Sequence, residues 1–172
     1  MTLTVLAATA EQTRALATRL AGVLRAGDLL VLSGDLGAGK TTFTQGLGAA
    51  LQVRGDVTSP TFVISRVHPS LVGGPALVHV DAYRLHGALE LDDLDLDASL
   101  DEAVTVVEWG TGVAEDLTDD RLEVEILRAH GDTDDETRTL RLTAVGDRWD
   151  GVDLAGLADP SLAVGHTGET AN

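Results

Sequence analysis

Gly34-Asp35-Leu36-Gly37-Ala38-Gly39-Lys40-Thr41 is the stretch from which the fold is predicted. Its spacing, Gly-x-x-x-x-Gly-Lys-Thr, is that of the P-loop or Walker A motif, whose backbone N–H groups surround phosphates. Residues 29–32, before it, form an apolar run of strand length, and residues 41–51, after it, read as a helix. Strand, glycine-rich loop and helix is the order that the motif requires. A glycine-rich turn without a ligand is the disfavoured alternative, because Lys40 is the only lysine in the chain.

The chemistry of phosphate binding assigns roles within this loop. Glycines allow the backbone to approach an anion closely, and the first turn of the following helix offers unpaired N–H groups. Lys40 is expected to face solvent and to reach the β- and γ-phosphates of a nucleoside triphosphate, while Thr41 is the expected Mg²⁺ ligand. Thr42 is placed for contact with the α-phosphate. The predicted nucleotide-binding residues are Gly34, Asp35, Gly37, Ala38, Gly39, Lys40, Thr41 and Thr42.

Composition predicts one compact, soluble and cytoplasmic domain. The chain has 172 residues, of which 44% are hydrophobic, so it is long enough to bury a core. It has no cysteine, which fits a reducing compartment, and shows neither a signal-type segment nor an apolar run of membrane-spanning length. A net charge of −16 and an aromatic fraction of 3% disfavour direct binding of nucleic acid. No membrane contact is expected.

Hydrophobic periodicity predicts an α/β fold. A capping box at Thr9 and Gln12 begins a helix whose apolar positions recur until Gly27. The result is a P-loop NTPase-like mixed β-sheet flanked by helices, with the P-loop at the carboxyl end of a central strand. We expect this domain to span residues 1–158, followed by a disordered tail at 159–172.

Further strands are predicted from apolar or alternating runs. Two of these runs, separated by a polar turn at residues 131–135, predict a C-terminal antiparallel strand pair. The predicted strands beyond the one at 29–32 are 61–67, 76–81, 104–107, 121–127 and 137–143.

Two clusters near predicted strands add candidate site residues. Residues 58–62, Thr-Ser-Pro-Thr-Phe, combine hydroxyls with proline, which suits a nucleotide-sensing switch and equally an ordinary turn into a strand. Asp81 ends an apolar strand, so its carboxylate is a candidate for orienting the attacking water, although it also suits capping of the next turn. His79 lies on the same strand face, where a packed side chain is the simpler interpretation.

A third cluster, Val106-Val107-Glu108-Trp109-Gly110, follows a strand that reads as buried. A carboxylate there needs a partner, and bound Mg²⁺ would provide one, as would Arg84 or a helix N-terminus. Trp109 is expected to pack and to change environment on ligand binding. The catalytic candidates are therefore Lys40, Asp81 and Glu108, and the metal candidates are Thr41 and Glu108.

Residues 90–102 carry seven carboxylates and no basic side chain. Leucines are interleaved with the acidic residues, so the segment predicts a short helix with a solvated acidic face. A docking surface for a basic partner is the alternative.

In combination these motifs resemble the TsaE family (formerly YjeE), the small ATPases of bacterial tRNA threonylcarbamoyladenosine biosynthesis. The resemblance covers residues 9–127 and rests on the P-loop through Thr42, on 59–62, on 79–85 and on Glu108-Trp109, in that order and spacing. The family's pattern usually continues with proline, where this chain has Gly110.

The resemblance also implies site roles and partners. Thr41 and Glu108 would hold Mg²⁺, Asp81 would be needed for ATP hydrolysis, and residues 59–62 would act as a switch. The implied partners are TsaB and TsaD. TsaD would transfer the threonylcarbamoyl group to tRNA, and ATP hydrolysis by a chain like this one would reset the complex. Such a chain would meet tRNA only indirectly, which agrees with its acidic charge.

Two other functions fit the P-loop. A small-molecule kinase would need an acceptor site and mobile arginines, but the segment after Asp81 is acidic. A nucleotide-gated interaction module would use ATP binding more than turnover. A GTPase is less favoured, because guanine selectivity commonly uses an Asn-Lys-x-Asp loop and the chain has no second lysine.

Overall fold

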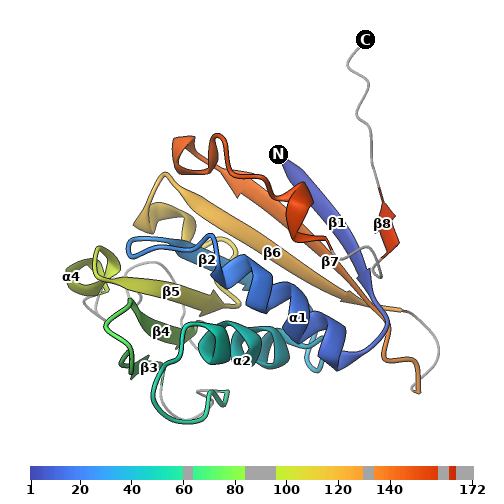
Figure 1. Ribbon diagram of the computed structural model, residues 1–172, viewed down its shortest axis with the longest axis horizontal. Helices are drawn as coiled ribbons and strands as arrows, with labels where there is room; N and C mark the ends of the chain where they lie inside the picture. The colour runs from blue at the N-terminus through green and yellow to red at the C-terminus, as the bar shows by residue number, and fades with distance from the viewer. Residues whose placement is uncertain (60–63, 84–95, 130–133, 159–162, 166–172) are drawn as a thin grey trace.

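The computed structural model describes residues 1–59, 64–83, 96–129, 134–158 and 163–165, which build a sheet with helices against it (Figure 1). The strands are β1 (Thr2–Ala7), β2 (Leu29–Ser33), β3 (Ser65–His68), β4 (Ala76–Asp81), β5 (Ala103–Glu108), β6 (Arg121–Arg128), β7 (Arg138–Val145) and β8 (Ala163–Gly165). The helices are α1 (Ala10–Ala21), α2 (Lys40–Ala50) and α4 (Asp97–Leu100), with 3-10 turns at Glu115–Leu117, Asp147–Trp149 and Ala155–Leu157.

The described strands form one mixed sheet in the order β3-β4-β5-β2-β6-β7-β1-β8. Its central part is parallel, since β4 pairs with β5, β5 with β2 and β2 with β6 in the same direction. The flanking strands are antiparallel, including the predicted C-terminal pair, which is confirmed as β6 and β7. The predicted α/β fold with a central strand before the glycine-rich loop (residues 34–41) is therefore confirmed.

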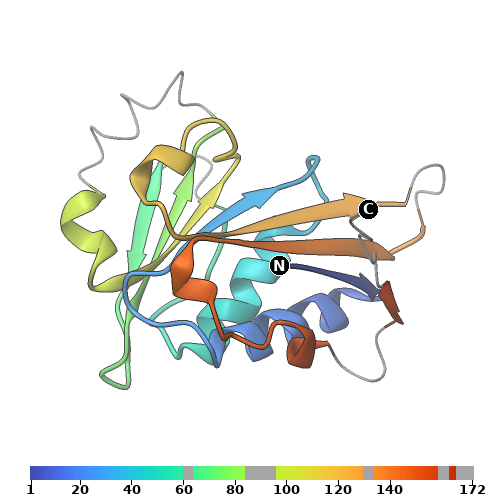
Figure 2. The ribbon, with the colours of Figure 1, turned by 90° about the horizontal axis from the view of Figure 1, so that it is seen from above.

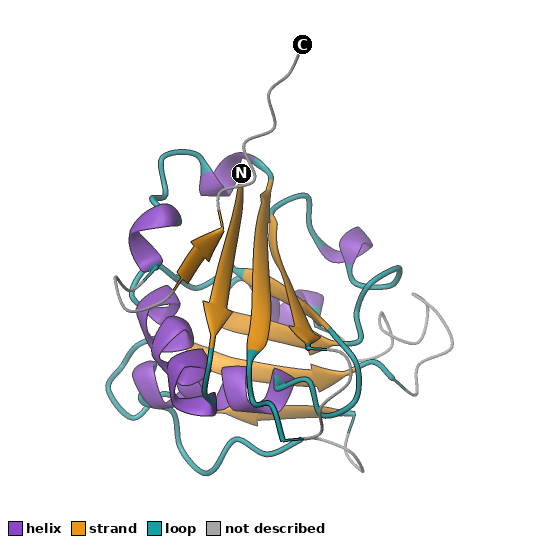
Figure 3. Cartoon of the chain, turned by 90° about the vertical axis from the view of Figure 1, so that its right-hand side faces the viewer, coloured by secondary structure: helices purple, strands orange, loops and turns teal. Residues whose placement is uncertain are grey.

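Apolar side chains pack against both faces of the sheet. Helices α1 and α2 cover one face, as Figure 2 shows from above and Figure 3 from the side. Alternate residues of the strands, such as Leu30 and Leu32 of β2, pack into the core under these helices. Their neighbours Leu29 and Val31 point to the other face, where they pack with residues 96–117. No helix among the described residues has both the length and the apolarity needed to cross a membrane.

The sequence prediction differs from the structure at the ends of the chain. Helix α1 ends at Ala21 rather than near Gly27, and its C-terminal cap is Gly22. Just beyond it, Val23 and Leu24 pack against the core outside the helix, and the carbonyl of Val23 accepts a hydrogen bond from Arg148. Strand β1 was not expected, and Ala163–Gly165, within the tail expected to be disordered, forms β8 against β1. The other residues after 158 lie outside the described residues.

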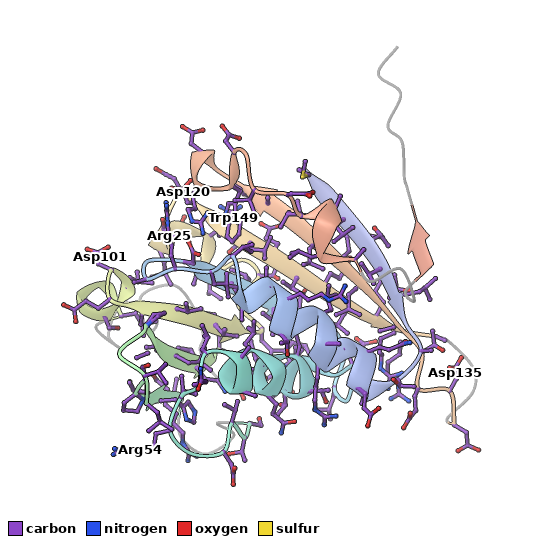
Figure 4. The ribbon with its side chains drawn as sticks, viewed as in Figure 1. Arg25, Arg54, Asp101, Asp120, Asp135 and Trp149 are labelled. Atoms are coloured by element: carbon purple, nitrogen blue, oxygen red, sulfur yellow. The ribbon has the colours of Figure 1, made fainter. Side chains whose placement is uncertain are left out.

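Different residues gather at the two ends of the parallel strands. Arg25, Asp101 and Asp120 precede β2, β5 and β6, and Figure 4 shows them together at one end of the sheet. At this end the buried carboxylate of Asp28 accepts two hydrogen bonds from Arg148, at 2.7 and 2.8 Å. The glycine-rich loop follows β2, and the candidate carboxylates Asp81 and Glu108 end β4 and β5. These groups therefore lie at the opposite, carboxyl end of the strands.

Replacement of Gly46 by alanine is expected to destabilise the fold. A Cβ at this position in α2 would lie 2.7 Å from the carbonyl oxygen of Arg14 and 2.9 Å from the Cβ of Ala17, both in α1. Overpacking of this kind costs about 1–3 kcal/mol, which outweighs the gain in helix propensity of about 1 kcal/mol. Gly48→Ala, in the same helix, is the comparison variant, because its closest contact, at 2.6 Å, is a side-chain methyl group of Val57 and not a backbone atom. Urea unfolding that shows Gly46→Ala to be as stable as Gly48→Ala would contradict this account of the helix contact.

Candidate functional site

The glycine-rich loop passes from β2 directly into α2. Gly34 lies so close to β6 that a Cβ would collide with the carbonyl oxygen of Ile126. Gly39 caps α2 with a φ of 113°, a left-handed conformation that an L side chain rarely adopts. No side chain among the described residues caps the helix. The first N–H groups of α2 therefore remain available at the positive end of the helix dipole, an arrangement that favours an anion.

Lys40 is enclosed by the loop that it follows. Its Nζ donates to the carbonyl oxygens of Gly34, at 2.7 Å, and Asp35, at 3.0 Å, and lies 4.1 Å from the ring centroid of Trp109. The residue is only 5% exposed, so the expectation that Lys40 faces solvent was wrong. Burial lowers the pKa of this amine below its usual 10.5, partly opposed by the charge of Glu108. An anion that joined the site would favour the charged amine and counter the cost of burial.

Glu108 ends β5 in a buried environment. Its Oε1 lies 2.9 Å from Nε2 of His79, which belongs to the neighbouring strand β4. Among the described residues, His79 and not a helix N-terminus is the hydrogen-bond partner of this carboxylate, and Arg84, the other predicted partner, lies outside them. His79 is indeed packed, as the simpler interpretation expected, but it is also the hydrogen-bond partner that sequence reasoning did not identify.

Asp81 lies directly opposite Glu108 where β4 and β5 end side by side. One of its oxygens accepts a hydrogen bond from the backbone N–H of Tyr83, at 2.9 Å, so Asp81 caps the following turn. This hydrogen bond uses Oδ1. Asp81 also lines the cavity that is described below. The ring of Tyr83 stacks against that of Trp109 at a tilt of 58°, with 5.3 Å between centroids.

Trp109 reaches the site through an unusual backbone conformation. Its φ is 59°, in the left-handed region that bulky residues rarely occupy, and its N–H bonds the carbonyl of Leu32. Backbone outliers of this kind gather at functional sites. Gly110 follows in a crowded position, where a Cβ would approach Val107 to 2.8 Å and Ala114 to 3.0 Å. The structure thus gives the path of this turn without the family's proline: the carbonyl of Gly110 accepts hydrogen bonds from the next loop.

These segments enclose a cavity of about 620 Å³. Its volume lies within the usual range for small-molecule sites, about 300–1,000 Å³. A second hollow, of about 430 Å³, lies beside the C-terminal half of α2, and Asp56 is the charged residue in its lining. The larger cavity is lined by Leu36, Gly37, Gly39, Lys40, Thr41, Thr42, Ser59, Asp81, Tyr83, Glu108 and Trp109.

Most of the predicted site residues therefore meet in one place. Gly34, Asp35 and Ala38 do not line the cavity, but their carbonyl groups hold the loop. The carbonyl of Ala38 accepts a hydrogen bond from Nε of Arg138, a residue of β7 that no motif indicated. Residues 60–62 of the predicted switch lie outside the described residues. The described part of the acidic segment 90–102 contains the short helix α4.

The oxygen ligands in the cavity suit Mg²⁺, which commonly takes part of its coordination from water and phosphate, better than a metal whose ligands all come from protein. Among the described residues, no three His, Asp or Glu side chains gather to hold an ion. Mg²⁺ is commonly bound through one or two protein groups together with waters and substrate phosphates. Thr41 and Glu108 offer such a minimal set, a hydroxyl and a carboxylate lining one cavity next to an anion-binding helix terminus.

Comparison with known proteins identifies relatives over most of the chain. The sequence model of the family "Threonylcarbamoyl adenosine biosynthesis protein TsaE" matches residues 7–139. The tRNA threonylcarbamoyladenosine biosynthesis protein TsaE of Streptomyces coelicolor is 64% identical over 146 residues, which are 84% of this chain and 99% of the relative. The protein of the same name from Bacillus subtilis is 40% identical over 141 residues, 81% of this chain and 84% of the relative.

A solved structure agrees with these sequence matches. The crystal structure of Bacillus subtilis YdiB superimposes with a TM-score of 0.69 at 35% identity, covering 87% of this chain and 90% of YdiB. Both the sequence and the fold are thus shared across most of each chain. The chain belongs to the TsaE family of tRNA threonylcarbamoyladenosine biosynthesis proteins.

Proposed function

We propose that this chain is an ATPase that binds and slowly hydrolyses Mg-ATP, and that hydrolysis drives the cycle of the complex that makes threonylcarbamoyladenosine in tRNA. The observation that carries the proposal is one cavity that joins the uncapped N-terminus of α2 and Lys40 to the carboxylates of Asp81 and Glu108. Anion-binding and cation-binding groups that face the same space suit a triphosphate with its divalent ion.

Binding would use groups already arranged in the loop. The N–H groups at the start of α2 would donate to phosphate oxygens, and Lys40 would exchange the carbonyls of Gly34 and Asp35 for the outer phosphates. Thr41 and Glu108 would hold Mg²⁺, which neutralises negative charge on the phosphates during transfer. Because Lys40 contacts the Trp109 ring, movement of the lysine would change the surroundings of that ring.

Hydrolysis would require a water aligned with the terminal phosphate. Asp81 is the candidate for orienting it, because its carboxylate lines the cavity beside Glu108 while Tyr83 holds its position. Attack on the γ-phosphorus would break its bond to the bridging oxygen and release ADP. No arginine lines the cavity among the described residues, so stabilisation of the transferring phosphoryl by these residues would rest on Lys40 and the Mg²⁺ ligands.

The partners belong to the same proposal. TsaB and TsaD would join the ATP-loaded chain, and tRNA would be met only through them, because a chain of net charge −16 repels a phosphate polymer.

Phosphate release from Mg-ATP, measured with the chain alone and then with TsaB and TsaD, tests this function. A slow rate alone and a changed rate in the complex are expected. Transfer of phosphate to a metabolite would indicate a kinase, and ATP-dependent assembly without release would indicate an interaction module. Mass spectrometry of tRNA from a strain depleted of the protein should show less threonylcarbamoyladenosine, restored by the parent gene and not by a hydrolysis-deficient variant.

Glu108→Gln is expected to weaken the Mg²⁺ dependence of hydrolysis more than it weakens ATP binding without metal. The amide oxygen can still accept the hydrogen bond from His79, so the shape is kept, but the charge that attracts a divalent ion is lost. Phosphate release across a magnesium titration measures the first effect, and calorimetry in EDTA measures the second. Parent rates at every magnesium concentration would make Glu108 an ordinary buried carboxylate.

A further inference from the structure

A buried hydrogen bond beneath the cavity joins the two strands that carry the candidate carboxylates. His79 is fully buried, the Glu108 side chain is 4% exposed, and Nε2 of His79 lies 2.9 Å from Oε1 of Glu108. In the parallel pairing of β4 and β5, Asp81 stands opposite Glu108 and His79 stands opposite Val106. His79 is therefore one pleat repeat below the carboxylates, on the same face. Glu108 lines the cavity and His79 does not.

The surroundings of the ring indicate which nitrogen carries its proton. A carboxylate oxygen accepts, so the hydrogen bond to Glu108 requires a proton on Nε2. Nδ1 is buried and has no hydrogen-bond partner among the described residues. The hydrogen bond therefore assigns a proton to Nε2, the ring nitrogen that faces Glu108.

We propose that His79 is a positioning residue for Glu108. Its Nε2–H holds Oε1 in one place, so that Oε2 remains for an ion in the cavity that Glu108 lines. The inference rests on the proposed function, in which Glu108 is a Mg²⁺ ligand. A ligand fixed in advance loses less freedom when the ion binds, and removal of such outer partners commonly weakens metal affinity about 10- to 100-fold.

Two substitutions separate positioning from simple space filling. His79→Gln places an amide N–H near the position of Nε2, whereas His79→Leu fills a similar volume without a donor. The Mg²⁺ concentration that half-saturates ATP binding is measured by calorimetry, together with ATP affinity in EDTA. His79→Leu is expected to raise the Mg²⁺ requirement about tenfold or more and to leave ATP affinity in EDTA close to the parent value. His79→Gln is expected to recover most of the parent Mg²⁺ requirement.

The double variant tests whether the effect passes through Glu108. In a Glu108→Gln background, His79→Leu is expected to add no further change in the Mg²⁺ requirement. A further increase there would overturn the proposal, as would a parent-like Mg²⁺ requirement in His79→Leu alone. An equal loss of ATP affinity in EDTA would also overturn it, because His79 would then support the fold of the whole cavity.

A measurement on the parent chain tests the hydrogen bond itself. Long-range ¹H–¹⁵N spectra of the imidazole rings, with His79 assigned by its absence in His79→Gln, should show a proton on Nε2. A ring protonated on Nδ1 alone cannot donate to Glu108 and would overturn the proposal. If the parent chain binds no ATP, the proposed function fails and the positioning role fails with it. If the parent needs Mg²⁺ and His79→Leu needs no more, the positioning role alone fails.

Discussion

Lys40→Ala is expected to weaken ATP binding by at least about 100-fold, since two charge-assisted contacts to phosphate are each worth about 1.5–3 kcal/mol. In the structure, loss of this side chain has a second consequence. The amine is buried and already holds two backbone carbonyls of the loop, so the variant loses loop contacts as well as a charge. Calorimetric titration with Mg-ATP measures the change in affinity.

A control variant tests whether loss of a side chain from α2 is by itself enough to weaken ATP binding. Gln45→Ala removes a side chain from the same helix that bonds the carbonyl of Val57 and does not line the cavity. It should bind ATP like the parent, and both variants should unfold cooperatively near the parent temperature. Unchanged ATP affinity in a folded Lys40→Ala variant would refute the phosphate-binding role of the loop.

The presence of TsaB and TsaD is expected to accelerate hydrolysis strongly, because an arginine supplied by a partner is worth about 10³ to 10⁵ in rate. Arg138 lies beside the glycine-rich loop but is occupied by the carbonyls of Ala38, Asp135 and Thr137. Arg84 lies outside the described residues. Nη1 of Arg128 would lie 3.7 Å from a Cβ on Gly37, so it too is beside this loop, but among the described residues no arginine lines the cavity.

Asp81 variants test whether this carboxylate is needed for the hydrolysis that the partners accelerate. Asp81→Asn keeps an oxygen that can cap the N–H of Tyr83, while Asp81→Ala removes the cap and the charge together. Both are expected to bind ATP and to join TsaB and TsaD, but to lose about 10²- to 10⁴-fold in turnover. Normal hydrolysis by either variant within the complex would remove Asp81 from the hydrolysis step, and assembly that ignores ATP would contradict ATP-dependent joining of the partners. Phosphate release and size-exclusion chromatography provide the two readouts.

Local sequence predicted the centre of the sheet well. The apolar run before Gly34 and the helix after it follow from the motif, and the alternating runs at 121–127 and 137–143 follow from their period. Strand β1 is harder to predict, because the alternation of Leu3 and Val5 is short and gains meaning only from pairing with β7. Periodicity alone extended α1 too far, because apolar Val23 and Leu24 continue the pattern beyond the cap at Gly22 and pack on the core without being helical.

The contacts inside the site depend on strand order, which local sequence does not give. His79 and Glu108 are 29 residues apart and meet only because β4 and β5 are neighbours. The contact of Arg138 with Ala38 spans 100 residues. Trp109 contacts Lys40 from a left-handed backbone conformation, for which a tryptophan gives no sequence signal. Sequence motifs therefore identified most of the site residues, but the contacts between these residues could be seen only in the folded structure.

A crystal structure with a non-hydrolysable ATP analogue and Mn²⁺ in place of Mg²⁺ tests the central claim most directly. We predict phosphates on the N-terminus of α2, Lys40 moved from its carbonyl partners to the outer phosphates, and the anomalous signal of the metal beside Thr41 and Glu108. A nucleotide bound elsewhere, or a metal without contact to either residue, would contradict the account of this cavity as the site of ATP hydrolysis.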